Sequence, residues 1–233
     1  MALERPKSLT ELVTKEVRDW IIDGRLDLGA PLSEAWIARE LAVSRTPVRE
    51  AINRLEIEGL LKSEPQRGTF VFELRGHELA KLCEVRVKLE TAALEWAMAE
   101  KRESLAEALA VRMATMTSAR EQGDDAAYLR EDTRFHQTIV DEADNRFLAD
   151  AYQTIAAKTA ALRNRLGGHP DHMAKSYAEH IAISAAVAAG DRREAERVLI
   201  LHIGRKEGSY WTLLADGAEG ARRGTARIPL AST

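Results

Sequence analysis

The chain has 233 residues, enough for two domains with separate cores, and its 45% hydrophobic and 30% charged content is ordinary for a globular protein. A formal net charge of −3 argues against indiscriminate nucleic-acid binding, which usually needs a strongly positive surface. No apolar run approaches the roughly 18 residues that span a bilayer, and the charged start MALERPKSLTE lacks the apolar core of an export signal. We therefore expect a cytoplasmic protein without a membrane partner.

The first half of the N-terminal region predicts a pair of short helices joined by a tight turn. Helical spacing in residues 8–23 places an apolar stripe on one side, made of Leu9, Leu12, Val13, Val17 and Ile21. A second helix lies in LSEAWIARELAV, with Ser33 as its cap, and the three-residue turn VSR leads into a third. Helices joined in this way form a helix-turn-helix, which presents its second helix outward.

The outward helix and a following hairpin complete the predicted N-terminal domain. In SRTPVREAINRLEIEGLL, residues 44–61, Pro47 suits the first turn, and Ala51, Ile52 and Leu55 form the buried side. The stretch LLKSEPQRGTFVFEL alternates like a two-stranded hairpin with its turn at residues 65–68. Residues 1–75 therefore predict a winged helix-turn-helix.

Arginines at the front of the outward helix are candidates for DNA contact. Arg45 and Arg49 are four residues apart and share one face, and guanidinium groups suit guanine edges and phosphates. Thr46 adds a hydroxyl beside them, and Arg67 lies at the tip of the hairpin. Residues 1–75 hold 12 Lys and Arg against 13 Asp and Glu, so any DNA affinity must come from local placement. The alternatives are solvated or Glu-paired arginines, and a winged helix that binds protein.

From Gly76 onward the sequence is almost entirely helical. We expect helices over 77–100, 103–122, 124–142, 145–166, 173–189 and 191–214, separated by glycines and by the GGHPD loop. Six helices with short connections form an antiparallel bundle, which we assign to residues 76–215. Residues 216–233 show no periodicity and are expected to be a flexible tail. The predicted fold class is mainly α: a winged helix-turn-helix followed by an antiparallel, all-helical bundle.

Ionisable side chains interrupt the apolar faces of three of these helices. Asp132 and His136 lie four apart on the stripe of helix 124–142, while His180 and His202 lie on the stripes of the last two helices. Burying such groups without partners is costly, and paired helical ligands of this kind can bind one metal ion. Hydrogen bonding between Asp132 and His136 is the alternative.

Arg86 and Glu90 interrupt the apolar stripe of helix 77–100 in the same way. An internal salt bridge between residues four apart is one interpretation. The other is that Arg86 binds the carboxylate of a small ligand inside the bundle.

The stretch PLSEAWIARELAVSRTPVREAINRLEIEGLLKSEPQRGTFV resembles the DNA-binding domain of the GntR family of bacterial transcription regulators over about 40 residues. The resemblance implies a homodimer on a pseudo-palindromic, double-stranded operator, with DNA contacts at Ser44, Arg45, Thr46, Arg49 and Gly68. Two departures are visible. Ala42 replaces a frequent glycine in the turn, and Ala35 stands where the fatty-acid regulator of the family has an arginine, leaving Arg39 as the nearby substitute.

Residues 77–214 resemble the FCD effector domain of the FadR branch of that family. The resemblance rests on DTRFH at 132–136, NRFL at 145–148, EH at 179–180, AGD at 189–191 and His202. It implies that one divalent cation is held by Asp132, His136, His180 and His202. Zn²⁺ or Ni²⁺ suits these ligands best, and Mn²⁺ and Fe²⁺ are compatible with them. The motif RVKLE at 86–90 implies that Arg86 lines the effector cavity.

These patterns together predict a transcription regulator, expected to be a repressor and not an enzyme. Its operator affinity would be controlled by a small organic acid bound at the metal. Two alternatives remain open at this point: a metal-dependent enzyme fused to a DNA-tethering module, and a regulator whose metal is purely structural.

Overall fold

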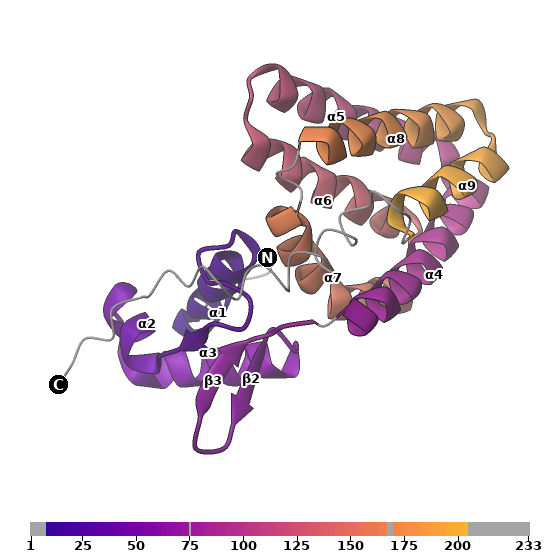
Figure 1. Cartoon of the computed structure of the whole chain (residues 1–233). Coiled ribbons are helices and arrows are strands. Elements are labelled where there is room, and N and C mark those ends of the chain that lie inside the picture. The colour runs from indigo at the N-terminus through magenta and orange to yellow at the C-terminus, as the bar shows by residue number, and fades with distance from the viewer. Residues whose placement is uncertain (1–7, 75, 167–169, 205–233) are drawn as a thin grey trace, which may run out of the picture.

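The computed structural model describes residues 8–74, 76–166 and 170–204. A small winged helix-turn-helix precedes a larger group of helices (Figure 1), which confirms the predicted fold class. None of the described helices is long and apolar enough to cross a membrane.

Helix α1, Leu9–Ile22, begins with a capping box in which Ser8 and Glu11 satisfy each other's backbone N–H groups. Val13, Val17 and Ile21 are buried, as expected. Leu9 and Leu12 are 51% and 48% exposed, so their assignment to the core was wrong. The buried face is centred on Val17 and includes two threonines and Trp20, which leaves the two leucines at its edges.

Helices α2, Glu34–Glu40, and α3, Arg45–Ile57, form the expected helix-turn-helix. Ser33 caps α2 by accepting a hydrogen bond from the Trp36 amide. Ser44 occupies the N-cap position of α3 without a side-chain cap bond. Val48, Ala51 and Leu55 are fully buried, and this packing fixes which side of α3 faces outward.

The wing is a three-stranded antiparallel sheet in the order β1-β3-β2, rather than the predicted two-stranded hairpin. Strands β2, Leu61–Glu64, and β3, Gly68–Val71, pair as expected. The additional strand β1, Pro31–Leu32, pairs with β3. The link before α2 lies extended along β3, because Gly29 and Ala30 exchange backbone hydrogen bonds with Val71.

Six helices follow in the described part of the chain: α4 Gly76–Glu100, α5 Arg102–Glu121, α6 Asp125–Glu142, α7 Arg146–Leu166, α8 Pro170–Ala189 and α9 Arg192–Ile203. Helix α8 begins three residues earlier than predicted, since proline is well suited to a first helical turn. Helix α9 ends at Ile203 because Gly204 adopts extended geometry, with ψ of 154°. The predicted continuation to residue 214 and the tail at 216–233 lie outside the described residues.

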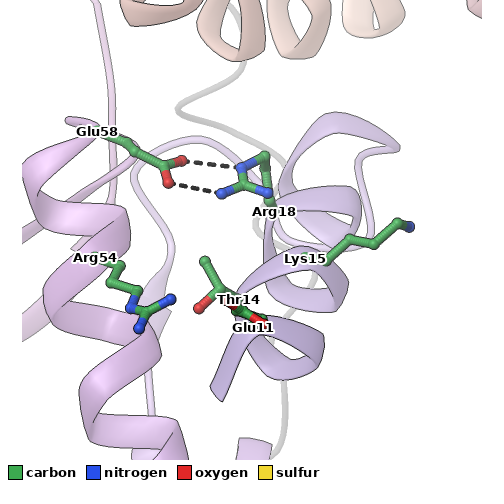
Figure 2. A pocket seen from close by; sticks show the side chains of 6 residues that line it. All are labelled: Glu11, Thr14, Lys15, Arg18, Arg54 and Glu58. Carbon is green, nitrogen blue, oxygen red and sulfur yellow. Dashed lines mark hydrogen bonds and ion pairs between the residues drawn. The ribbon is translucent and has the colours of Figure 1, made fainter. Parts of the chain in front are cut away.

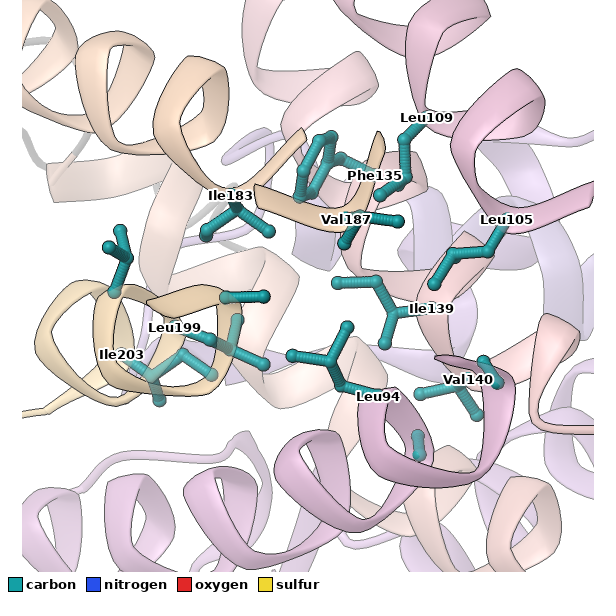
Figure 3. Packing of buried hydrophobic residues seen from close by; sticks show 14 of the residues in the cluster. Leu94, Leu105, Leu109, Phe135, Ile139, Val140, Ile183, Val187, Leu199 and Ile203 are labelled. Carbon is teal, nitrogen blue, oxygen red and sulfur yellow. The ribbon is translucent and has the colours of Figure 1, made fainter. Parts of the chain in front are cut away.

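Two hydrophobic clusters hold the chain together. The larger cluster contains residues from all six helices α4 through α9, and it includes Leu94, Phe135, Ile139 and Leu199 (Figure 3). The smaller fills the winged helix but also includes residues of α4 and of α7, among them Leu162. Helix α7 therefore belongs to both cores, and it lies between α1 and α6 (Figure 1).

Ala42, in the helix-helix turn, has a φ of 51°. This left-handed conformation costs an L-residue about 1–2 kcal/mol. We predict that Ala42→Gly raises the melting temperature of the protein by about 2–4 °C. Ala35→Gly, at an exposed position of α2, is the matched control and should lower it, because glycine weakens a helix. Calorimetry would contradict this account of the turn if both variants melted lower than the wild type.

Candidate metal centre and nucleic-acid interface

The outward face of α3 presents Arg45, Thr46 and Arg49, all of them exposed. Arg49 pairs with Glu34 of α2 at 3.3 Å, and their side chains are 66% and 37% exposed. An exposed pair of this kind contributes at most about 1 kcal/mol, so DNA phosphates can displace it. Glu50, the carboxylate next to Arg49 in sequence, instead accepts a hydrogen bond from Thr10 at 2.7 Å.

The wing tip projects away from the helices and carries Arg67 (Figure 1). Gln66 and Gly68 have φ values of 63° and 107°, which form the tight turn. Arg67 is exposed, pairs with Glu64 and lies over the Phe70 ring. Arg39, near the end of α2, is also exposed. The residues expected to contact DNA are thus accessible on α2, α3 and the wing.

A shallow hollow of about 430 Å³ lies between α1 and α3 (Figure 2). Arg18 and Glu58 form a bidentate ion pair across it, at 2.9 and 2.6 Å, and Arg54 and Lys15 also line it. The positive charges that line the hollow are largely balanced by the carboxylates of Glu11 and Glu58. None of its lining residues belongs to the histidine cluster. It therefore offers no distinct acid-binding chemistry.

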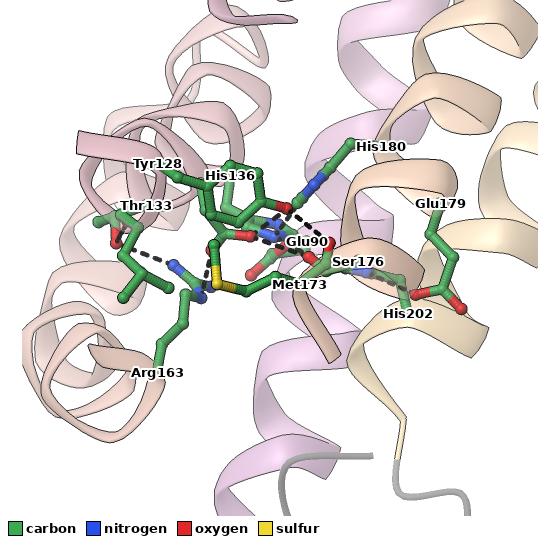
Figure 4. Close-up of polar contacts among 12 residues, drawn as sticks. Glu90, Tyr128, Thr133, His136, Arg163, Met173, Ser176, Glu179, His180 and His202 are labelled. Atoms are coloured by element: carbon green, nitrogen blue, oxygen red, sulfur yellow. Dashed lines mark hydrogen bonds and ion pairs between the residues drawn. The ribbon is translucent and has the colours of Figure 1, made fainter. Parts of the chain in front are cut away.

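Asp132, His136, His180 and His202 come together in the interior of the helical domain, and each is buried. Figure 4 shows the three histidines directed toward one another. One ligand atom from each residue lies within 4.8 Å of all the others. The Nε2 atom of His136 is 3.1 Å from that of His202 and 3.4 Å from that of His180. His180 Nε2 is also 3.4 Å from an Asp132 oxygen. The structure therefore brings together all four residues expected from the sequence.

The outer nitrogens of two of these rings are held by carboxylates. His136 Nδ1 lies 2.6 Å from Glu90, and His202 Nδ1 lies 2.9 Å from Glu179. A carboxylate at Nδ1 favours a proton on that nitrogen, which leaves the Nε2 lone pair directed inward. Lone pairs that face one another repel unless a cation lies between them. Metal bonds of about 2.0–2.1 Å also put neighbouring donors about 3.0–3.4 Å apart, so the residues fit a divalent ion.

The charge states in the interior suit the same ion. Burial, and then the positive charge of Arg86, lower the pKa of His136 well below its usual value. Burial and His202 have the same effect on the pKa of His180. Burial alone would raise the pKa of Asp132, but Arg163 and the imidazoles lower it overall. Neutral imidazoles and an ionised carboxylate are the forms that bind metal.

Glu90 is the central acceptor beneath this cluster. It accepts hydrogen bonds from Arg86 Nε at 2.6 Å and from the Tyr152 hydroxyl at 3.0 Å, in addition to its contact with His136. The internal salt bridge between Arg86 and Glu90, one of the two sequence interpretations, is therefore present. Arg86 Nη2 is nevertheless buried without a hydrogen-bond partner, so one donor of that guanidinium group is available to a ligand.

Arg163 is the residue that sequence reasoning missed. Its Nε lies 2.5 Å from Asp132 Oδ2, its Nη1 donates to Thr133 at 3.0 Å, and its Nη2 is buried without a partner. It follows Tyr152 and Thr159 at helical spacing on α7, and all three are buried. That spacing is a signal in the sequence, although it does not reveal the contact with Asp132.

Known families match most of the chain. The model for bacterial regulatory proteins of the gntR family matches residues 9–71, and the FCD domain model matches residues 81–205. The chain is 32% identical over 195 residues to a probable D-xylose utilization operon transcriptional repressor of Paenarthrobacter nicotinovorans, covering 82% of this chain and 85% of that protein.

Two further similarities are more limited. The gluconate operon transcriptional repressor of Bacillus subtilis is 32% identical over 136 residues, which are 58% of this chain and 56% of that protein. A solved structure of a GntR regulator from Rhodococcus sp. RHA1 superposes with a TM-score of 0.75 at 23% identity, over 84% of this chain and 94% of that one, and shows the same fold.

These families and relatives are transcription regulators rather than enzymes. They therefore support the regulator and not the alternative of a metal-dependent enzyme fused to a DNA-tethering module. With both domain models matched and a relative above 30% identity along most of the length, the chain belongs to the GntR family of bacterial transcription regulators that carry an FCD domain.

Proposed function

We propose that this regulator is a homodimeric repressor that binds a pseudo-palindromic operator and responds to a small carboxylate bound at a divalent metal. The observation that carries the proposal is the buried cluster of three imidazoles and one aspartate, which is joined in one chain to a winged helix. Because its target is bacterial DNA, the proposed place of action is the cytoplasm.

On the DNA side, α3 enters the major groove with its N-terminal residues toward base edges and phosphates. The proposed contacts are Ser44, Arg45, Thr46 and Arg49 of α3, Arg67 and Gly68 of the wing, and Arg39 of α2. All seven are exposed. A dimer presents two such sets, which compensates for the near-neutral charge of the whole domain.

We predict that Arg45→Ala and Arg49→Ala each weaken operator binding by about 10-fold or more. Where the lost contact is to a phosphate, the binding constant should also depend less steeply on salt concentration. The operator would be selected from random duplexes by the wild-type protein, and affinities measured by fluorescence anisotropy at several salt concentrations. Arg54→Ala is the matched control. It removes the same charge from the same helix, but Arg54 lies on the side that faces α1. Full affinity in the Arg49 variant, or an equal loss in the Arg54 variant, would refute this interface.

The proposed dimer contact lies on α4. Val85, Leu89, Ala92 and Trp96 recur at i, i+4, i+7 and i+11, so they share one face. Val85 and Trp96 are 48% and 41% exposed. Leu89 and Ala92 between them are half-buried against the core of the same chain. Exposed apolar residues such as Val85 and Trp96 commonly mark protein interfaces, and tryptophan is enriched there. A second copy of the chain would bury this stripe.

The metal, held by Asp132, His136, His180 and His202, is proposed to be Zn²⁺ or Ni²⁺, with Mn²⁺ and Fe²⁺ also compatible with the ligands. When bound, the ion supplies a positive centre that attracts a carboxylate. The protein contributes two buried guanidinium groups, Arg86 and Arg163, each with an Nη2 donor that lacks a partner. Buried donors of this kind are costly unless a partner satisfies them, and a small organic acid would do so.

Two relatives narrow the class of acid to test. They are named as repressors of D-xylose utilization and gluconate operons, so sugar-derived acids come first in a screen that also includes dicarboxylates, lactate and pyruvate. Repression relieved by such an acid is the proposed direction of control.

We predict that a sugar acid such as D-xylonate or D-gluconate stabilises the metal-loaded protein. At about 100 times its dissociation constant, the acid should add about 2.7 kcal/mol, or about 5–10 °C in melting temperature. Neutral D-xylose is the matched control, and the same acids should have little effect after metal removal by a chelator. Metal uptake without a shift from any acid would instead favour a structural metal, and an equal shift from D-xylose would refute the carboxylate requirement.

A further inference from the structure

Three consecutive residues of α7 face two different domains. Arg163 contacts the metal-site residue Asp132 at 2.5 Å. Asn164 Nδ2 donates to the carbonyl of Ile22 at 3.0 Å, and Arg165 Nη2 donates to the carbonyl of Leu26. Ile22 is the last residue of α1, so one turn of α7 contacts both the candidate metal centre and the end of a winged-helix element.

The contacts of α7 with the winged helix compensate for a missing local partner. The last carbonyl groups of a helix accept no hydrogen bond from an amide of the same helix. The last turn of α1 also carries no basic residue that could donate to them. Asn164 and Arg165 supply donors there from outside the domain. Lys158 also lies against Gly59, directly after α3, so closely that an added Cβ would be 2.5 Å from its Nζ. Helix α7 therefore contacts the end of α1 and the turn that follows α3.

On its other side, Arg163 competes with the proposed cation for one carboxylate. Asp132 Oδ1 faces His180 and Ser176, at 3.4 and 3.3 Å, while Oδ2 faces Arg163. A divalent ion at Oδ1 withdraws negative charge from Oδ2 and repels the guanidinium group, in an interior where charges are weakly screened. Occupation of the centre therefore changes the force on Arg163, which is 3% exposed and has little room to move independently.

We propose that α7 transmits the state of the metal centre to the winged helix. Arg163 is the positioning residue, Asn164 contacts the last residue of α1, and Arg165 contacts Leu26 in the link that follows α1. The inference rests on the proposed metal site and specifies how that site regulates the DNA-binding domain. Since α7 is a continuous helix, displacement of Arg163 also displaces the next two residues. The alternative route is α4, which follows the wing directly in the chain and continues into the bundle.

Hydrogen-deuterium exchange of the full chain, with and without Zn²⁺, tests this transmission. The turn at the end of α1 is a suitable reporter, because the amides of Asp23 and Leu26 are bonded to the carbonyls of Asp19 and Trp20. We expect Zn²⁺ to change exchange in residues 20–26 by about fivefold, the low end of typical couplings between sites. Unchanged exchange in the wild type, with Zn²⁺ bound, would overturn the inference.

Variants of α7 distinguish this route from the one through α4. The double variant Asn164→Ala and Arg165→Met should bind Zn²⁺ with wild-type affinity in calorimetric titration, yet lose the change in residues 20–26. Arg146→Met, on the exposed first turn of the same helix, is the matched control and should retain it. Retention of the change in the double variant would overturn the inference in favour of α4.

A third variant keeps the test informative if the double variant does not fold. Arg163→Lys keeps the positive charge near Asp132 but loses the fork that spans Asp132 and Thr133, so it should reduce the exchange response. A wild-type response in this variant would overturn the role of Arg163. If the wild type bound no Zn²⁺, the metal site itself would be refuted, which calorimetry detects independently of exchange.

Discussion

One electrostatic constraint underlies the proposed function: three imidazole nitrogens and a carboxylate oxygen face one another in the buried interior of the helical domain. Glu90 and Glu179 hold the outer nitrogens of two rings, so the inner lone pairs cannot turn away from one another. Burial lowers the pKa values of His136 and His180, which favours the neutral form of these two rings. A divalent cation would relieve the repulsion between the inner lone pairs, and the proposed site places it at this point.

The proposed centre also offers a route by which the helical domain could control the winged helix. Asp132 is shared between the cluster and Arg163, and α7 packs into the cores of both parts of the chain. A structural metal would need only the four ligands. The unpartnered donors of Arg86 and Arg163 and the contact of α7 with the end of α1 are additional features, and they favour a site that senses an acid.

Most of the helices, and the four clustered residues, could be predicted from the sequence, because burial imposes a helical period on apolar positions. The resemblance to FCD domains, rather than spacing, identified Asp132 and the histidines as one ligand set. Periodicity does not reveal partners, so the contact between Arg163 and Asp132 was missed. Strand β1 has only two residues, too few for an alternating pattern, and Leu9 shows that helical spacing alone does not locate the centre of a buried face.

Metal titration of chelator-treated protein, followed by elemental analysis, tests whether the four clustered residues hold a cation. The proposed site predicts one divalent ion per chain in the wild type and in His77→Gln, whose histidine is exposed at the start of α4. It also predicts severe loss of binding in His180→Gln. A wild-type protein that takes up neither Zn²⁺ nor Ni²⁺, or a His180→Gln variant that binds as tightly as the wild type, would contradict it.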